Sequence, residues 1–198
     1  MPLLGTLLAT IGVGIIILIV VIGLFVLFGL WFVGVFNSLI RLRNRVDESW
    51  AQIDVQLKRR YDLIPNLVNT VKGYATHEKE LFENVTKARA SAIAAGSVGE
   101  QAKAENMLTS ALRSIFAVVE NYPDLKANQN FLALQEELAS TENKISFARQ
   151  HYNEIVRLYN TRQQVFPNSI VAAMSSHKPR EMFEVEDMAV REAPKVQF

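Results

Sequence analysis

The first forty residues differ from the rest of the chain in their pattern of apolar and polar positions. Residues 1–40 contain no charged side chain, and Thr10 is the only polar residue between Leu7 and Phe36. A membrane-spanning helix needs about 20 apolar residues, and a helix from Leu7 to Phe36 extends about 45 Å. We therefore predict an N-terminal segment, residues 1–36, that contains one transmembrane helix at about residues 7–36.

Two other interpretations of this apolar segment have to be considered. A cleaved signal peptide has basic residues before an apolar core of about 7–15 residues and a small-residue cleavage site after it. Here the apolar run is longer, and the first basic side chain, Arg41, follows it. The signal peptide is therefore disfavoured, and a buried core helix is the remaining alternative to a membrane span.

Basic residues cluster directly after the apolar segment. They are Arg41, Arg43, Arg45, Lys58, Arg59 and Arg60. Because short cytoplasmic flanks of membrane helices are enriched in Lys and Arg, this asymmetry predicts a single-pass protein of the inner (plasma) membrane, with its N-terminus outside and its helical domain in the cytoplasm. Arg41, Arg43 and Arg45 are the predicted membrane-interface residues, which set the topology and can also attract anionic lipid headgroups.

After Asn37 the apolar positions recur at steps of three and four, which is typical of a helix with one buried face. In the first such helix, which we expect to end near Gly73, these positions are Leu39, Leu42, Val46, Trp50, Ile53, Leu57, Tyr61, Ile64, Val68 and Val71. In the last and clearest helix they are Phe131, Leu134, Leu138, Thr141, Ile145, Ala148, Tyr152, Ile155 and Tyr159.

Capping residues predict two more helices between these. Thr76 is placed to cap a helix that runs to Gly96, and Ser97 with Glu100 matches the capping box of a helix that ends before Pro123. The predicted fold is therefore all-α: a transmembrane helix followed by an antiparallel bundle of about four long helices, residues 37–166, with coiled-coil-like packing. For the C-terminal tail, residues 167–198, we expect a short helix from Asn168, then irregular chain docked on the bundle through Met182, Phe183, Val196 and Phe198.

Pro65 lies inside the first bundle helix and has polar neighbours. An interior proline removes one backbone hydrogen bond, so we expect a kink or a helix restart near Asp62. Arg59, Arg60, Asp62 and Asn66 surround Pro65 and form a candidate polar cluster. The favoured interpretation is structural, in which these side chains satisfy the freed backbone groups and pair with each other, and a binding site is the alternative.

Composition excludes several classes of function. The chain has 21 Lys and Arg against 20 Asp and Glu, and a net charge of +1 gives no field for nucleic-acid binding. Cysteine is absent, and the three histidines match neither His-Glu-x-x-His nor the Glu-x-x-His of di-iron bundles. Gly12 and Gly14 do not continue into a nucleotide-binding fingerprint. We therefore predict no catalytic, cofactor-binding or metal-binding residue, and a protein that is not an enzyme.

Several longer segments of the chain resemble the LemA family of bacterial membrane proteins. The matching segments are 59–68 (RRYDLIPNLV), 71–78 (VKGYATHE), 120–128 (ENYPDLKAN), 141–145 (TENKI), 148–150 (ARQ), 152–153 (YN) and 193–198 (APKVQF). The resemblance covers nearly all of residues 37–198. It implies one N-terminal membrane anchor followed by an antiparallel helical bundle.

The family resemblance implies little about activity. No enzymatic chemistry is established for the family, and its members are linked with membrane remodelling, including magnetosome vesicles, and with neighbouring membrane proteases. In one family variant a lipobox Cys precedes the domain, whereas here Phe36 and Asn37 follow a full apolar span. Because such lipoproteins face outward, this departure leaves the opposite orientation as an alternative.

Two functions follow as hypotheses. The first is a non-enzymatic, membrane-anchored bundle that self-associates as a scaffold or adaptor, in membrane remodelling or envelope maintenance. The second is a regulatory or accessory subunit of a membrane protease or signalling complex. The expected partners are the lipid bilayer, further copies of the chain, and a membrane protease or other envelope protein, but not nucleic acid. We expect no cofactor.

Overall fold

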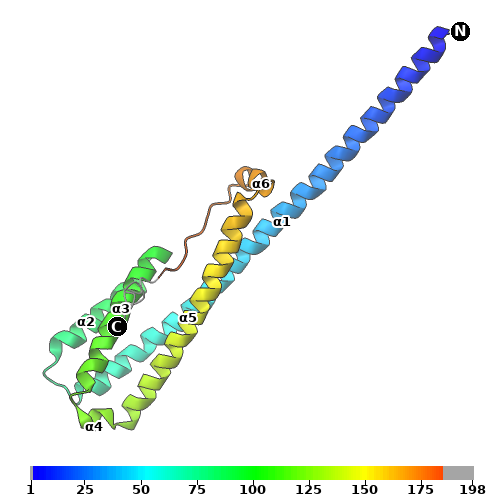
Figure 1. Ribbon diagram of the computed structural model, residues 1–198. Coiled ribbons are helices and arrows are strands. Elements are labelled where there is room, and N and C mark those ends of the chain that lie inside the picture. Colours follow the sequence, from blue (N-terminus) through cyan, green and yellow to red (C-terminus); the bar gives the residue numbers. More distant parts are fainter. Residues whose placement is uncertain (1, 185–198) are drawn as a thin grey trace, which may run out of the picture. The chain divides into compact units, whose positions relative to one another are not determined.

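The computed structural model describes residues 2–184, and all regular structure in this range is helical, which confirms the predicted all-α fold class (Figure 1). The helices are α1 (Pro2–Lys72), α2 (Lys79–Ala94), α3 (Val98–Val119), α4 (Pro123–Lys126), α5 (Gln129–Gln164) and α6 (Asn168–Met174). The chain separates into two compact units. The first unit is Met1–Asn44 with Tyr159–Pro179, and the second unit is Arg45–Leu158 with Arg180–Phe198.

Helix α1 is one uninterrupted helix of 71 residues that includes Pro65. The predicted restart near Asp62 is therefore wrong. Proline lacks the N–H that would bond to the carbonyl four residues earlier, at Tyr61. In the structure that carbonyl oxygen accepts a hydrogen bond from Arg89 Nε of α2 at 2.8 Å instead. Since the orphaned carbonyl has a partner from another helix, α1 continues to Lys72 without a break.

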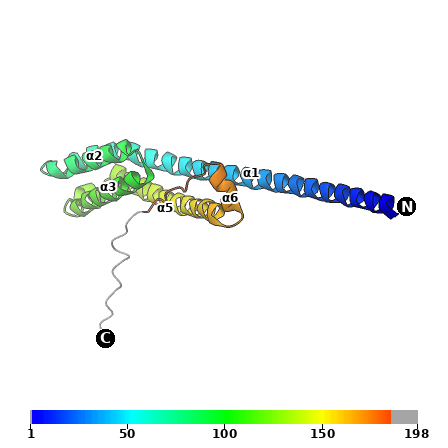
Figure 2. The same cartoon turned by 90° about the horizontal axis from the view of Figure 1, so that it is seen from above.

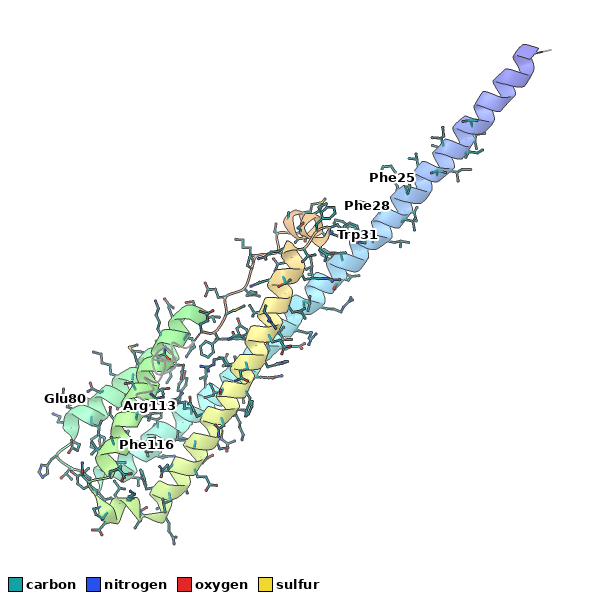
Figure 3. All side chains as sticks on the ribbon, viewed as in Figure 1. Phe25, Phe28, Trp31, Glu80, Arg113 and Phe116 are labelled. Atoms are coloured by element: carbon teal, nitrogen blue, oxygen red, sulfur yellow. The ribbon has the colours of Figure 1, made fainter. Side chains whose placement is uncertain are left out.

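The apolar part of α1 is long enough to cross a membrane. From Val13 to Leu30 its side chains are exposed, and its most apolar stretch has a mean hydropathy of 3.3. Figure 3 shows Phe25, Phe28 and Trp31 on this helix. An exposed apolar helix of this length is expensive in water, so its composition and exposure favour a membrane span over the buried core helix considered above.

The predicted core positions of the second unit are largely confirmed. All α1 positions from Val46 to Val71 are buried except Trp50, which is half-buried. On α5 the predicted positions of this unit are buried except Leu134 and Ala148, which are half-buried. Helices α2 and α3 lie side by side (Figure 2), and Phe82, Val85, Leu108 and Ile115 from these two helices are buried. The heptad spacing therefore identified the packed faces.

Helix ends follow the predicted capping only in part. Ser97 and Glu100 form the predicted capping box at the start of α3. Thr76 does not cap α2, because that helix begins three residues later with Glu78 at the N-cap and no side-chain cap bond. At the start of α5, Asn128 Oδ1 accepts hydrogen bonds from the N–H groups of Asn130 and Phe131. The polar residues after Pro123 thus include a local cap.

Residues 180–184 of the C-terminal tail belong to the second unit and pack within it. Phe183 is 1% exposed, and its ring contacts Trp50 edge-on at 5.6 Å between centroids. Its backbone is held by Asn153, whose Nδ2 donates to the Phe183 carbonyl and whose Oδ1 accepts from the Phe183 N–H. Met182 is half-buried. Two other expected docking residues, Val196 and Phe198, lie outside the described residues.

In the first unit, α6 packs against α1. The buried cluster consists of Val35 and Leu39 of α1 with Val171 and Ala172 of α6, and Trp31 and Phe32 pack against it. The predicted short helix after Pro167 is thereby confirmed. Asn168 is its first residue and is buried, whereas Pro167 occupies the N-cap position.

Candidate functional site: a buried polar cluster on α1, α3 and α5

The second unit contains a group of polar side chains in its interior, which we call the Arg60 cluster. Its members are Arg60, Tyr61, Gln101, Glu105, Thr109 and Glu142, and they come from α1, α3 and α5. The side chains of Arg60 and Glu105 are each only 5% exposed, whereas that of Glu142 is 50% exposed. A charged group of this burial persists only when it is paired and hydrogen-bonded.

Arg60 uses its guanidinium to join the three helices. Its Nη1 lies 3.2 Å from Glu105 Oε2 of α3 and 2.8 Å from Glu142 Oε2 of α5. Its Nη2 donates to Thr109 Oγ1 at 2.8 Å. The rigid, multiply donating guanidinium suits this role, because one planar group satisfies acceptors in several directions.

The second oxygen of Glu105 is also satisfied. Tyr61 Oη donates a short hydrogen bond to Glu105 Oε1, and Gln101 Nε2 donates to the same oxygen at 3.1 Å. Gln101 Nε2 also lies 2.8 Å from Tyr61 Oη and 3.1 Å from the Ala92 carbonyl oxygen. The cluster is therefore a closed network in which both buried carboxylate oxygens have donors.

Burial shifts the protonation equilibria of two members. Desolvation raises the pKa of Glu105, although hydrogen bonds from Tyr61 and Gln101 and the charge of Arg60 act against it. Desolvation, followed by the adjacent Glu105 carboxylate, raises the pKa of Tyr61 far above its usual value. Tyr61 therefore stays a neutral phenol and a hydrogen-bond donor across the physiological pH range.

The predicted polar cluster around Pro65 is not one site. Arg59 does not join the Arg60 cluster but pairs with Glu137 of α5, with 2.6 Å between Nη2 and Oε1 and both side chains substantially exposed. Asp62 and Asn66 are exposed, and the main-chain oxygen of Asn66 accepts from Thr70 Oγ1. The Tyr61 carbonyl that Pro65 frees is bonded by Arg89 of α2, a residue outside the predicted group.

Sequence reasoning missed Gln101 and Glu105, although a signal was present. These residues lie one helical turn apart on the same face as Ala104 and Leu108, which are buried. A polar pair on an apolar helix face requires a buried partner. The pattern could therefore have suggested an inward-facing cation, but it could not have selected Arg60 over Arg59.

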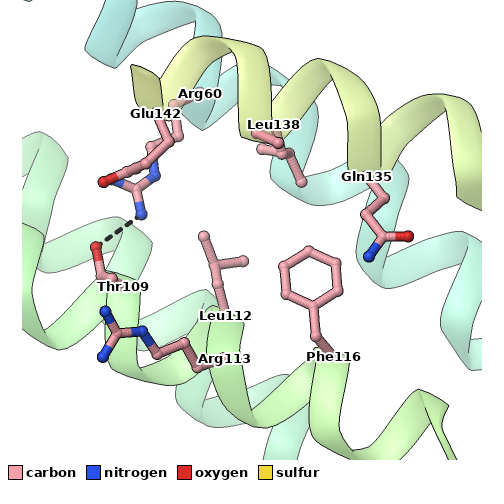
Figure 4. Close-up of a pocket in the computed structure, with 9 residues that line it drawn as sticks. Arg60, Thr109, Leu112, Arg113, Phe116, Gln135, Leu138 and Glu142 are labelled. Carbon is pink, nitrogen blue, oxygen red and sulfur yellow. Dashed lines mark hydrogen bonds and ion pairs between the residues drawn. The ribbon is translucent and has the colours of Figure 1, made fainter. Parts of the chain in front are cut away.

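A groove adjoins the Arg60 cluster between α3 and α5 and has a volume of about 280 Å³ (Figure 4). It is lined by Arg60, Thr109, Leu112, Arg113, Phe116, Gln135, Leu138, Ala139 and Glu142. Figure 4 shows Leu112, Leu138 and Phe116 facing its middle, with Arg60 and Thr109 at one end. Such a groove can accept an apolar side chain but offers no nucleophile with an adjacent base.

The arrangement is suited to holding helices together and shows no set of ligands for a metal. Among the described residues there is no group of three or more His, Cys, Asp or Glu side chains placed to hold a metal ion. The Arg60 cluster side chains contact one another. We conclude that this site fixes the packing of α1, α3 and α5.

The predicted interface residues and a histidine lie near the boundary of the first unit. Arg41, Arg43 and Arg45 are exposed on α1, and Arg41 and Arg43 belong to this unit. His177, which follows α6, lies 3.0 Å through Nδ1 from Tyr159 Oη and packs edge-on to Phe36. Burial, and secondarily the positive charge of Arg43, lowers the pKa of His177 below 6.5.

We expect this His177 shift to make the first unit less stable in mild acid. The folded state favours the neutral imidazole. The contribution of His177 to the free energy of unfolding is therefore fully present above the unfolded pKa of about 6.5, and it is lost as pH falls through the lower folded pKa. The melting temperature of the protein in nanodiscs should drop as pH falls below about 6.5, and His177→Gln should flatten that dependence. Equal slopes for both proteins would contradict this assignment.

Comparison with known proteins identifies the family of the chain. The LemA family matches residues 49–198, a range that contains the whole Arg60 cluster. The chain is 28% identical over 160 residues to Protein LemA of Metamycoplasma hominis, covering 75% of this chain and 72% of that protein. It is 22% identical over 175 residues to the magnetosome proteins MamQ 1 and MamQ 2 of Paramagnetospirillum magneticum, covering 75% of this chain.

The alignment covers 64% of each MamQ protein, so the chain spans less than two thirds of their length. The family match, by contrast, extends over most of this chain and begins just after the first unit's part of α1. The motifs around Pro65 and Pro123 fall within it. The chain therefore belongs to the LemA family.

Proposed function

We propose that this LemA family protein is a non-enzymatic, membrane-anchored scaffold whose copies associate through the apolar part of α1. The observation that supports this most directly is the exposed apolar part of α1, which carries Gly12, Gly23 and Gly34 on one face. The relatives named as magnetosome proteins favour a role at membranes for this chain as well.

The glycines of α1 support close approach of a second helix. Gly12, Gly23 and Gly34 recur every 11 residues, which is close to three helical turns, so they share one face with a drift of about 20° per step. A Cβ added at any of them meets nothing within 4 Å. Small residues at membrane helix interfaces let backbones pack closely, so this face suits a second copy of α1.

The Arg60 cluster supports the non-enzymatic part of the proposal. Its buried acid, phenol and guanidinium are engaged with each other, and the raised pKa values of Glu105 and Tyr61 come mainly from burial. A catalytic acid or base needs access to a substrate atom. The alternative function, a regulatory subunit of a membrane protease or signalling complex, uses the same domain as an adaptor and is distinguished by what copurifies with it.

The association proposal predicts that bulk on the glycine face disrupts oligomers. Gly23→Leu should lower the association constant at least tenfold, or about 1.4 kcal/mol, because the added side chain separates the helices. Mass photometry of the full-length protein in native-membrane nanodiscs measures the number of copies. A heteromeric particle containing a protease would instead support the accessory-subunit alternative.

Gly14→Leu is the matched control for this test. Gly14 precedes Gly23 by nine residues, so it lies on the opposite face of the same helix. A Cβ at Gly14 also meets nothing within 4 Å, so the two substitutions differ only in the face they change. Equal copy numbers for wild type, Gly14→Leu and Gly23→Leu would overturn association through the glycine face.

The proposed location of the domain is the cytoplasmic side of the inner membrane. The support is the set of basic residues after the span, including the exposed Arg41, Arg43 and Arg45. Since the chain has no native cysteine, Ser114→Cys on the exposed surface of α3 provides a unique label site. We expect no reaction with a membrane-impermeant maleimide in intact cells and full reaction after lysis. Labelling of intact cells would place the domain outside.

A further inference from the structure

We propose that the corner formed by the end of α5 and by α6 is a second membrane contact, which inserts shallowly into an anionic lipid surface beside the span of α1. This inference rests on the proposed function, because it requires α1 to be a membrane anchor. It adds a lipid-binding surface at a defined place in the fold. We call residues 163–176 the α5–α6 corner.

The corner exposes large apolar side chains although one of its faces is already packed. Val171 and Ala172 are buried against α1. On other sides of the corner, Val165 is 50%, Phe166 77%, Ile170 44% and Met174 71% exposed. From Gln163 to Ser176 there is no charged side chain. A helix that is apolar on its packed side and also on its free sides is typical of a membrane-associated element.

The position of α6 on α1 identifies lipid as the occupant. Helix α6 packs with Val35 and Leu39 of α1 in one buried cluster, and Trp31 and Phe32 pack against that cluster. All of these α1 residues except Leu39 precede Phe36 and belong to the apolar segment itself. The part of this cluster from Trp31 to Val35 extends over about 6 Å of helix, which lies within the depth of about 5–10 Å at which interfacial helices bury their apolar faces. When residues 7–36 cross a bilayer, α6 is therefore held at the level of its interface.

The charge of the first unit fits an anionic surface. Neither residues 1–44 nor residues 159–179 contain an Asp or Glu, so all 20 acidic residues of the chain belong to the second unit. The charged side chains of the first unit are Arg41, Arg43, Arg162 and Lys178, and all four are exposed. Basic residues beside an apolar surface add electrostatic attraction to anionic headgroups. A protein partner that bound the α5–α6 corner would not require the first unit to lack acidic residues altogether.

Single-cysteine labelling of the full-length protein tests the proposal. The environment-sensitive fluorophore NBD is attached at Met174→Cys, Leu24→Cys or Asn44→Cys, in nanodiscs of phosphatidylcholine with a minority of phosphatidylglycerol. Met174 reports the corner, Leu24 the middle of the span, and Asn44 an exposed site on α1 about 12 Å beyond Phe36. Nitroxide lipids labelled near the headgroup quench fluorophores at the interface, and iodide quenches those in water.

We expect nitroxide-lipid quenching at Met174 to exceed that at Asn44 by at least about twofold, with protection from iodide, because the corner is buried in the interface. Phe166→Ser should reduce the lipid quenching at Met174. The matched control is Phe147→Ser, which removes an aromatic side chain of similar exposure, 72%, outside the corner and should leave the quenching unchanged.

The outcomes separate this inference from the proposed function. If Leu24 is not quenched by lipids labelled in their acyl chains, the membrane anchor itself is wrong. If Leu24 is quenched and Met174 behaves like Asn44, the corner does not touch lipid and only this inference is overturned. If Met174 is protected from iodide but is not quenched by lipid, protein covers the corner, which also overturns it.

Discussion

Replacing Arg60 with methionine should destabilise the second unit by about 3–5 kcal/mol, because it leaves the buried Glu105 carboxylate without its cation. Glu105 is 5% exposed, and Arg60 also bridges to Thr109 and Glu142. Methionine retains most of the apolar stem of the side chain, so the loss reports the charge and its hydrogen bonds. Urea unfolding of the full-length protein in mild detergent, followed by far-UV circular dichroism, measures the change.

Two variants make this prediction specific. Arg59→Met is the neighbouring control, since Arg59 pairs with Glu137 on the surface and should cost only about 0–1 kcal/mol. The double variant Arg60→Met with Glu105→Leu removes both buried charges and should recover part of the lost stability. If Arg60→Met were no more destabilising than Arg59→Met, the Arg60 cluster would not be holding the helices together.

Replacing Phe183 with alanine should cost about 3–5 kcal/mol, because it opens a cavity in the core at the point where the tail docks. Phe183 is 1% exposed and contacts Trp50, which also packs edge-on against Tyr152 at 5.3 Å between centroids. The same urea experiment applies. In a Trp31→Phe background, Trp50 fluorescence provides a second, local readout of the cavity.

Phe147→Ala is the control for the tail prediction. Phe147 is 72% exposed on α5, so truncating it removes a surface aromatic of the same size and should change stability by no more than about 0.5 kcal/mol. A Phe183→Ala protein as stable as the Phe147→Ala protein would mean that the tail lies on the domain without contributing to its core. In that case the tail from residue 180 onward could be removed without loss of folding.

Periodicity along the sequence predicted the helices and their buried faces well. Most of the positions that the steps of three and four predict in α1 and α5 are buried, including Thr141, which is 1% exposed despite its hydroxyl. The buried residues Ser49, Arg60, Leu67 and Val156 were not among them. The Ser97–Glu100 capping box was also predictable from the sequence, since both of its partners lie within one helical turn. These features depend on residues close together in the chain, and the apolar segment depends on composition alone.

The candidate site was less predictable, because its residues come from three helices. Arg59 and Arg60 are chemically identical neighbours, but Arg60 is buried where it meets Glu105 and Thr109 of α3, whereas Arg59 is exposed and pairs with Glu137. Likewise, the position of Pro65 predicts a freed carbonyl at Tyr61. It does not predict that Arg89 of α2 donates a hydrogen bond to this carbonyl. The partner of Arg60 in α3 and the partner of the Tyr61 carbonyl in α2 each lie 28 or more positions away in the sequence.

The sequence by itself therefore determined the long apolar segment, the all-helical fold and most of the faces that the helices bury, because helical periodicity, capping and hydropathy are local properties. Only the tertiary structure decided which arginine enters the core, how α1 continues through Pro65 and where α6 packs on α1. The physical reason is that a buried charge, an orphaned carbonyl and a short apolar helix are each stabilised by partners that the fold brings together from distant parts of the chain.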